Sequence, residues 1–296
     1  MSAVKAGLPK IAAVFREPEF SNQALEADRA ILTAAAEHLR DRFDVTFSEA
    51  RAFQAPDDLR GVLTMAESGP VLTALSALEA QGVCVFNSSR AVRSCFRSAL
   101  YTALSTMGFP VPPTVRCEVG SETSIAHAFS SITSWSNGFW IKRADFHALS
   151  DSDVVFQKNS SGLHEVLEGF SQRGISSVVL QRHISGRVLK FYRVADRFFD
   201  TRWLEGSFRG ETEFSGDVVF ARDRVESLSR SIGEALGLKV FGGDLVIESS
   251  GKYWVIDVND WPSFRTCREQ AAEAIAHEFS DALRQRARIL AAETVV

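Results

Sequence analysis

The sequence contains no run of about 18 apolar residues, which is the length that a membrane-spanning helix requires. Its first residues, MSAVKAGLPKIAAVF, also lack the long apolar segment of a secretion signal. Both absences argue against a membrane partner and against export through a cleaved signal. We therefore expect a soluble, cytoplasmic protein.

Cysteine is scarce, with 4 residues in a chain of 296. They are Cys84, Cys95, Cys117 and Cys267, and no two of them form a C-x-x-C motif. Each lies within an apolar pattern, which favours small buried side chains in a reducing cytosol over disulfides or metal ligands. A catalytic thiol is the less favoured alternative.

Several patterns that carry catalysis or binding are also missing. The chain has no G-x-x-x-x-G-K-[ST] phosphate loop, no Ser-His-Asp arrangement and no His/Cys cluster at metal-ligand spacing. A formal net charge of -4 and a pI of about 5.9 argue against a nucleic-acid partner, because such proteins usually carry a basic domain. A local basic pocket stays compatible with these values, because net charge does not say where the charges lie.

What the sequence does contain is an ordinary globular composition, 45% apolar and 24% charged. Short apolar runs alternate with helical patterns in the first third, which predicts a parallel α/β lobe. The Pro-rich segment at 108–113 ends this pattern, and a polar hinge at 182–186 separates a small central unit from a strand-rich third one. We predict lobes at 1–112, 113–184 and 185–296.

The expected elements follow from the same patterns. Strands are predicted at 11–15, 61–65, 82–86, 139–142, 154–156, 177–181, 188–194, 198–203, 240–247 and 253–258. Helices are predicted at 24–39, 71–80, 90–107, 163–173, 222–236 and about 265–290.

The most informative segment is the predicted hairpin at 240–258, whose turn is Ser-Ser-Gly at 249–251. Asp257 and Asn259 are two residues apart on the second strand, so they project to one face, and the hairpin brings Asp244 alongside them. A carboxylate among apolar neighbours costs several kcal/mol unless it has a partner. Mg²⁺ prefers such oxygen ligands, so we predict a metal site on these three residues. The alternative is that the two aspartates cap strand ends or pair with arginines.

This segment resembles the magnesium motif of the ATP-grasp enzymes. That family includes D-alanine–D-alanine ligase, glutathione synthetase and the inositol tris/tetrakisphosphate kinases. The resemblance rests on Asp-x12-Asp-x-Asn followed by an aromatic-Pro element, and it extends over nearly the whole chain. Other similar segments occur in the family's order: Val85-Phe-Asn-Ser-Ser89 with Phe96-Arg97 and Gly108-Phe-Pro-Val-Pro-Pro113, then Phe139-Trp-Ile-Lys142, then Val178-Val-Leu-Gln-Arg-His-Ile-Ser-Gly186.

The resemblance implies a three-lobed α/β fold with α+β character in the C-terminal lobes, and ATP clamped between two antiparallel-sheet lobes. It implies ATP and Mg²⁺ as cofactors, two ions being expected, with a small anionic acceptor as the other ligand. Lys142 would contact the ATP phosphates, and Arg97 stands where the family has a second phosphate-reaching lysine. The hinge residues Gln181, Arg182, His183 and Ile184 would offer backbone groups to adenine.

Two of these roles have plain alternatives. Lys142 at a strand end is usually exposed, and Arg97 could be a surface arginine on an amphipathic helix. The loop at 143–153 departs from the family because it contains no glycine, which leaves open how it covers the phosphates.

Five basic residues are candidates for substrate contact. By similarity to the inositol phosphate kinases, Lys190, Arg202 and His147 would contact the acceptor and take part in catalysis. Arg16, after the first strand, and Arg265, after the metal motif, could hold an anionic acceptor. For Arg16, His147, Lys190 and Arg202 the alternative is surface charge balanced by neighbours such as Asp196 and Asp200.

Three functions remain open. The preferred one is a kinase that phosphorylates a hydroxyl of a polyol or inositol phosphate, because of Lys190, His147, Arg202 and the aspartate at 257. The second is a carboxylate–amine ligase acting through an acyl phosphate, since most ATP-grasp enzymes are ligases. The third is a degenerate nucleotide-binding regulatory module. The acceptor, the pathway and the oligomeric state are not predicted.

Overall fold

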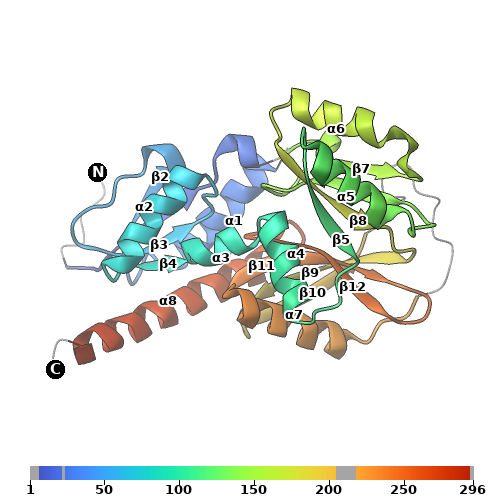
Figure 1. The fold of residues 1–296 in the computed structure, drawn as a ribbon. Coiled ribbons are helices and arrows are strands. Elements are labelled where there is room, and N and C mark those ends of the chain that lie inside the picture. The colour runs from blue at the N-terminus through green and yellow to red at the C-terminus, as the bar shows by residue number, and fades with distance from the viewer. Residues whose placement is uncertain (1–6, 22–23, 205–217, 294–296) are drawn as a thin grey trace.

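The computed structural model describes residues 7–21, 24–204 and 218–293. These residues form three four-stranded sheets, one in each third of the chain (Figure 1). The first sheet lies at the left of the view in blue, the second at the upper right in green, and the third beneath it in orange and yellow. The predicted fold class is therefore seen directly, whereas the predicted lobe boundaries stay predictions.

The N-terminal sheet is parallel, in the order β2-β1-β3-β4. Its strands are β1 (Lys10–Phe15), β2 (Asp44–Glu49), β3 (Leu59–Thr64) and β4 (Cys84–Phe86). The helices α1 (Leu25–Glu37) and α2 (Gly69–Ala80) connect them. Strand β2 was missed from the sequence because it is a half-exposed strand at the edge of the sheet, whose apolar signal is only two residues long.

The single helix predicted at 90–107 is wrong. Two helices occupy the segment, α3 (Ser89–Ser94) and α4 (Arg97–Thr106), and Phe96 between them is extended. The amide of Ser98 in the first turn of α4 donates to the carbonyl of Ala144, which follows a strand of the central sheet (3.0 Å). The break therefore lets the start of α4 bond to another lobe, an interaction that a continuous helix would replace with its own hydrogen bonds.

The central sheet is antiparallel, in the order β5-β8-β6-β7. It consists of β5 (Thr114–Glu118), β6 (Phe139–Arg143), β7 (Val154–Gln157) and β8 (Ser177–Arg182), with helices α5 (Glu122–Ile132) and α6 (Leu163–Gln172). Strand β5 and helix α5 were not predicted. Short 3-10 turns lie at Pro18–Phe20 (η1), Ala50–Ala52 (η2), Asp151–Asp153 (η3) and Ser160–Gly162 (η4).

The C-terminal sheet is antiparallel, in the order β10-β9-β11-β12. Its strands are β9 (Arg187–Val194), β10 (Phe198–Trp203), β11 (Val240–Ile247) and β12 (Tyr253–Asp260), and helix α7 (Arg222–Leu236) packs against them. The β11–β12 hairpin agrees with the sequence prediction.

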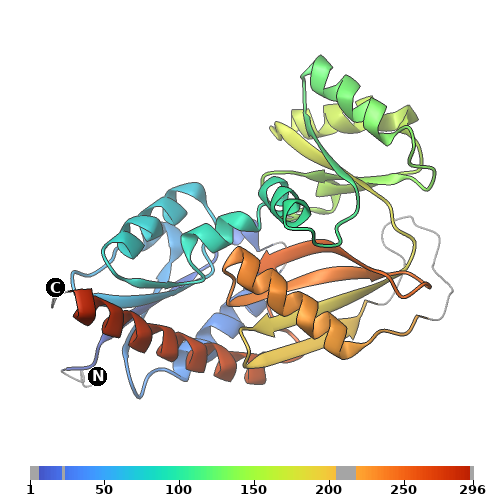
Figure 2. The same ribbon diagram turned by 60° about the horizontal axis from the view of Figure 1, so that its bottom comes forward.

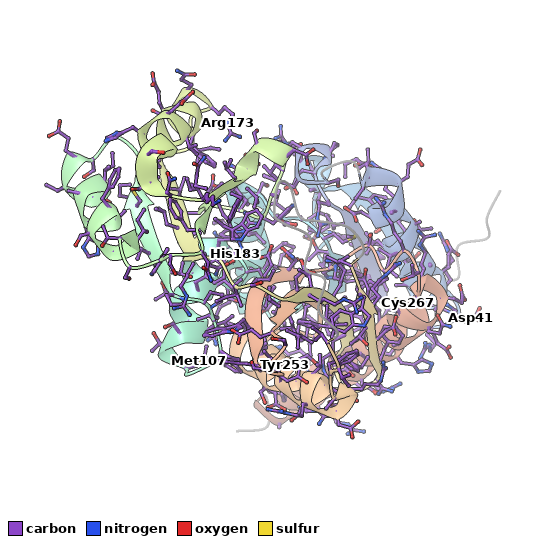
Figure 3. The ribbon with its side chains drawn as sticks, turned by 90° about the vertical axis from the view of Figure 1, so that its right-hand side faces the viewer. Asp41, Met107, Arg173, His183, Tyr253 and Cys267 are labelled. Carbon is purple, nitrogen blue, oxygen red and sulfur yellow. The ribbon has the colours of Figure 1, made fainter. Side chains whose placement is uncertain are left out.

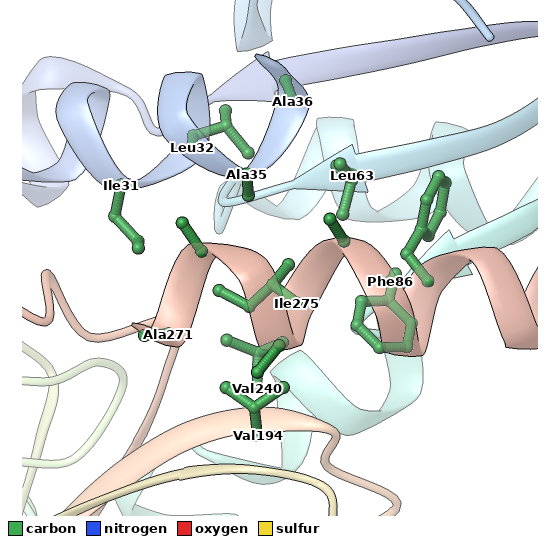
Figure 4. Packing of buried hydrophobic residues seen from close by; sticks show 14 of the residues in the cluster. Ile31, Leu32, Ala35, Ala36, Leu63, Phe86, Val194, Val240, Ala271 and Ile275 are labelled. Atoms are coloured by element: carbon green, nitrogen blue, oxygen red, sulfur yellow. The ribbon is translucent and has the colours of Figure 1, made fainter. Parts of the chain in front are cut away.

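The closing helix α8 (Arg268–Glu293) joins the first and third lobes. In Figures 1 and 2 it runs from the C-terminal sheet along the blue N-terminal lobe. Figure 4 shows Ile275 of α8 between residues of both lobes, with Ile31 and Leu63 on one side and Val194 and Val240 on the other. The largest buried apolar cluster is thus shared between segments more than 200 residues apart.

Two composition-based expectations can be compared with the fold. Cys95, Cys117 and Cys267 are buried and Cys84 is half-buried, and all four are free thiols. Within the described ranges, no helix is both long and apolar enough to cross a membrane. The cytoplasmic location stays a prediction.

Candidate functional site

Two cavities lie between the lobes, one lined by the central and C-terminal lobes and one lined by all three. The hinge cavity is lined by the hinge segment and by strands of both antiparallel sheets, including Trp140, Lys142, Gln181, Arg182, His183 and Ile184. Figure 3 shows His183 at the junction of the green central lobe and the orange C-terminal strands. The carboxylate cavity, of about 290 Å³, is lined by Arg16, Arg97, His147, Lys190, Asp257 and Asn259 among others.

The carboxylates of the predicted metal site come together on the hairpin. Asp244 on β11 is directly opposite Asp257 on β12, and Asp257 and Asn259 face the same cavity. Lys190 on β9 is opposite Asp244 in the register and its Nζ lies 2.7 Å from an Asp244 carboxylate oxygen. The two aspartates are therefore neighbours across the hairpin, and Asn259 follows two residues after Asp257 on β12.

Arg97 is buried, so the alternative of a surface arginine is wrong. It is 2% exposed, and its Nη2 donates to Oδ2 of Asp257 at 3.1 Å. Its Nε and Nη1 are buried and have no hydrogen-bond partner, and neither does Oδ1 of Asp257. Burial raises the pKa of Asp257, but Arg97 and Lys142 outweigh burial and hold the pKa below its usual value. Asp257 is thus an anion with a free oxygen beside a cation with free donors.

Lys142 is also buried, which excludes an exposed strand-end lysine. Its Nζ donates to Oε1 of Gln181 (2.8 Å), to the backbone carbonyl of Ile256 (3.1 Å) and to the hydroxyl of Tyr101 (3.2 Å). Burial, followed by the positive charge of Arg97, lowers the pKa of Lys142 to about 7. None of its three partners is an anion, so an arriving anionic group would favour the charged ammonium.

A bulge in the hairpin supplies one of these partners. Asp244 pairs with Asp257 but Leu245 pairs with Val255, so Ile256 has no partner in the register on β11. Its carbonyl instead accepts from Lys142 and Tyr101. The bulge therefore links the central lobe to the strand that carries Asp257.

Two backbone amides of the hinge already have hydrogen-bond partners. The amide of Arg182 donates to Pro113 (2.9 Å) and the amide of His183 to Gly138 (3.1 Å). Trp140 Nε1 donates to Nδ1 of His183 at 3.2 Å. Ile184 follows directly and also lines the cavity. The adenine contacts predicted for 181–184 stay predictions, now confined to backbone groups other than these two amides.

Two of the five candidate acceptor residues are held by acids of the N-terminal lobe. Arg16 Nη1 lies 3.0 Å from Asp28 and its Nε lies 2.8 Å from Glu67. Arg16 Nη2 also donates to the carbonyls at 260 and 261. His147 Nδ1 lies 3.0 Å from the Glu67 carboxylate. Lys190 and Arg97 are also paired with carboxylates. These four basic residues therefore do not form a pocket with excess positive charge, although the net charge of the chain allows one.

Arg202 and Arg265 are placed differently. Arg202 is exposed on β10, opposite Lys190 in the register, and Arg265 is exposed between β12 and α8. Neither belongs to the described residues that line the two cavities. A direct acceptor contact by either remains a prediction.

The donor set suits Mg²⁺ better than a softer metal. Asp244, Asp257 and Asn259 offer only oxygen, and one buried oxygen of Asp257 has no partner. Within the described ranges, no group of three or more His, Cys, Asp and Glu side chains is arranged to hold a metal. An ion at this site would therefore take its remaining ligands from the nucleotide phosphates, as Mg²⁺ commonly does.

Comparison with known proteins identifies the architecture. The D-alanyl-alanine synthetase A of Vibrio cholerae superposes with a TM-score of 0.69 at 13% identity, over 94% of this chain and 100% of that one. The chain has the ATP-grasp fold. A D-alanine–D-alanine ligase from Bacillus anthracis complexed with ATP gives 0.68 at 13% identity, over 96% and 99%. An ATP-grasp RimK domain protein from Sphaerobacter thermophilus gives 0.66 at 17%, over 90% and 98%.

Sequence comparison adds one ATP-grasp match. Residues 168–279 match the family model of the inositol 1,3,4-trisphosphate 5/6-kinase ATP-grasp domain. No curated protein matches the chain in sequence. The predicted resemblance to the ATP-grasp enzymes, which comprise kinases and ATP-dependent ligases, is therefore confirmed, and the acceptor is not identified.

Sequence reasoning missed three acids of the carboxylate cavity. Asp28, Glu67 and Asp260 are each buried and line it. Burial, followed by the nearby Glu67 carboxylate, raises the pKa of Asp260 to about 7. Asp260 could have been suspected from its place beside Asn259, whereas Asp28 and Glu67 follow no local pattern and meet only through Arg16.

Proposed function

We propose that this chain catalyses ATP- and Mg²⁺-dependent phosphoryl transfer to an oxygen of a small anionic acceptor. The observation that carries the proposal is the path of contacts between the two cavities. Lys142 lines the hinge cavity, and Ile256, to which it donates, precedes Asp257 in the carboxylate cavity. ATP bound at the hinge would thus direct its phosphates towards Asp257 and Asn259.

The chain's own groups suit this chemistry. Bound Mg²⁺ would neutralise charge on the phosphates at Asp244, Asp257 and Asn259. Lys142 would gain a full positive charge beside a phosphate oxygen, because an adjacent anion raises the pKa of a lysine. Arg97 would direct its two free buried N–H groups to the same anion. In-line transfer then depends mostly on positioning and electrostatics.

Kinase activity on a polyol or inositol phosphate hydroxyl is the preferred form. The family model that matches residues 168–279 describes an inositol 1,3,4-trisphosphate 5/6-kinase domain. That match spans Lys190, Asp244, Asp257 and Asn259. Lys190 would pass from Asp244 to an acceptor phosphate when the metal takes over the carboxylate.

A carboxylate–amine ligase is the second candidate, and one observation favours it. Arg16, Arg97, Lys190 and His147 each already have a carboxylate partner. A substrate with several phosphates would need unpaired cations, whereas an acceptor with one carboxylate would need fewer. The two candidates predict different products.

The test combines purified protein, ATP and Mg²⁺ with a panel of inositol, inositol phosphates and amino acids. ADP release is measured, and products are identified by phosphorus NMR. We expect a stable phosphomonoester. Free phosphate with a new amide would instead establish the ligase, and ATP binding without turnover would support the regulatory-module alternative.

Asp257→Asn provides the decisive variant. It keeps the shape of the side chain but removes the charge, so turnover should fall about 100-fold or more. The matched control is Asp223→Asn on α7, an exposed aspartate outside both cavities. Equal turnover of Asp257→Asn and the wild type would refute the proposed site.

A further inference from the structure

The loop at 143–153, which has no glycine, is held against the N-terminal lobe. His147 engages both ring nitrogens there: Nδ1 lies 3.0 Å from a carboxylate oxygen of Glu67, and Nε2 lies 2.9 Å from the carbonyl of Phe20. Glu67 follows strand β3 and Phe20 ends the turn η1. A side chain with both nitrogens engaged has no ring nitrogen left for an acceptor phosphate.

An aromatic contact accompanies these polar ones. The ring of Phe146 is 4.8 Å from that of Phe20 and 4.9 Å from that of Phe96, measured between centroids. Phe96 directly precedes Arg97, which holds Asp257. The loop therefore packs on the N-terminal lobe and on the start of α4 at once.

The loop keeps its shape through a buried carboxylate rather than through glycine. Asp153 is 1% exposed, and its Oδ2 accepts from the amides of Leu149 (2.9 Å) and Ser150 (3.0 Å). Arg143 and Arg173 also pair with it. The turn is thus prearranged, and only its tip has to be anchored.

We infer that Glu67 and the rings of Phe20 and Phe96 form a receptor for this loop, and that the His147–Glu67 pair is a latch that closes one wall of the carboxylate cavity. This cavity is the acceptor cavity if the proposed function holds, on which this part of the inference rests. His147 and the adjacent Ala148 line that cavity together with Lys190 and Asp257. Glu67 is then a positioning residue, acting on the acceptor through His147. This assigns His147 to the wall of the cavity rather than to catalysis.

The charges around the latch are closely balanced. His147 faces Glu67 and Arg16 from the N-terminal lobe, and Asp257 and Asp260 from β12. Burial lowers the pKa of His147, but Glu67 outweighs burial and the net shift is upward. The ion pair is therefore complete below the ordinary histidine value of 6.5 and weakens as pH rises through the higher value of the folded protein.

The latch can be tested without ATP or acceptor, so its failure is distinct from failure of the proposed function. Amide hydrogen exchange is followed at 144–149 in the full chain, for the wild type, His147→Gln, Glu67→Gln and the double variant. Each single change should lower the protection of these amides about tenfold, because a buried charge-assisted bond is lost. The double variant should add little, because both changes break one contact.

Controls separate the latch from general destabilisation. His127→Gln, which changes an exposed residue of α5, should leave the loop unchanged. Because Glu67 also pairs with Arg16, His147→Gln is the cleaner variant, and Phe146→Leu tests the aromatic half if either polar variant fails to fold. Protection at 144–149 equal to the wild type in His147→Gln and Phe146→Leu, or additive losses in the double variant, would overturn the latch.

A kinetic readout distinguishes positioning from mere stability. Once an acceptor is known, His147→Gln should raise its KM about tenfold while changing the KM for ATP less than twofold, since the latch closes the acceptor side. The protection of the wild-type loop should also fall between pH 6 and pH 9, and this dependence should be absent in Glu67→Gln. Equal effects on both KM values would contradict the assignment of His147 to a wall of the acceptor cavity.

Discussion

Buried charges, each next to a group of another lobe, characterise the site at the scale of single residues. Arg97, Lys142 and Asp257 come from α4, β6 and β12; the first two are buried, and 15% of the Asp257 side chain is exposed. Burying such charges costs several kcal/mol unless partners compensate. The free donors of Arg97 and the free oxygen of Asp257 indicate that compensation is incomplete without a ligand.

Lys142 gives a prediction with a defined sign. In the unfolded chain its pKa is the ordinary 10.5, and in the folded protein it is about 7. Between these values the unfolded state holds more protons, so stability rises with pH by up to about 1.4 kcal/mol per unit. In urea unfolding at pH 7, 8 and 9, the wild type should gain stability relative to Lys142→Met. Exposed Lys158→Met is the control, and parallel curves for wild type and Lys142→Met would contradict the depressed pKa.

At the scale of elements, the β11–β12 hairpin is the most constrained part of the site. Its bulge turns the carbonyl of Ile256 towards Lys142, and its close strand approach leaves no room at Gly243. A Cβ at Gly243 would lie 2.6 Å from the carbonyl oxygen of Asp257 and 2.6 Å from the ring of Phe191. The glycine therefore sets how closely Asp244 and Asp257 approach.

Gly243→Ala should lower stability by about 1–3 kcal/mol through overpacking and should weaken Mg²⁺-dependent ATP binding as the two strands separate. Gly169→Ala on α6 is the matched control. A Cβ there meets nothing within 4 Å, so that variant should gain about 0.5–1 kcal/mol. Urea unfolding and calorimetric ATP titration measure both quantities. Unchanged ATP affinity in Gly243→Ala would show that the spacing of the two strands does not control Mg²⁺-dependent ATP binding.

At the scale of the whole molecule, the first and third lobes share one core. The ring of Phe279 on α8 is fully buried and lies 5.7 Å from that of Phe86 on β4. Asn87 adds polar contacts, bonding the backbone of Val240 and Lys239 at the start of β11. The N-terminal sheet is therefore positioned by the end of the chain, which fixes Glu67 and Phe20 relative to the C-terminal sheet.

Phe279→Ala should cost about 3–5 kcal/mol, because a large buried side chain leaves a cavity. Ile289→Ala, at an exposed position of the same helix, should change stability by less than about 0.5 kcal/mol. Thermal and urea unfolding compare the two. If Phe279→Ala lost no more stability than Ile289→Ala, α8 would not be integral to the N-terminal core.

The sequence by itself determined the β11–β12 hairpin, most strands and helices, and the placing of Asp244 opposite Asp257. These depend on periodicity and on a short turn, which are local properties. Only the tertiary structure decided that α3 and α4 are separate, because the break serves a bond to Ala144. It alone revealed that Asp28, Glu67 and Asp260 line the cavity. It alone also revealed that Arg16 pairs with Asp28 and Glu67, and that His147 pairs with Glu67. Those contacts join residues from different elements, and in the case of His147 and Glu67 from different lobes. No local pattern records which distant side chain will neutralise a buried charge.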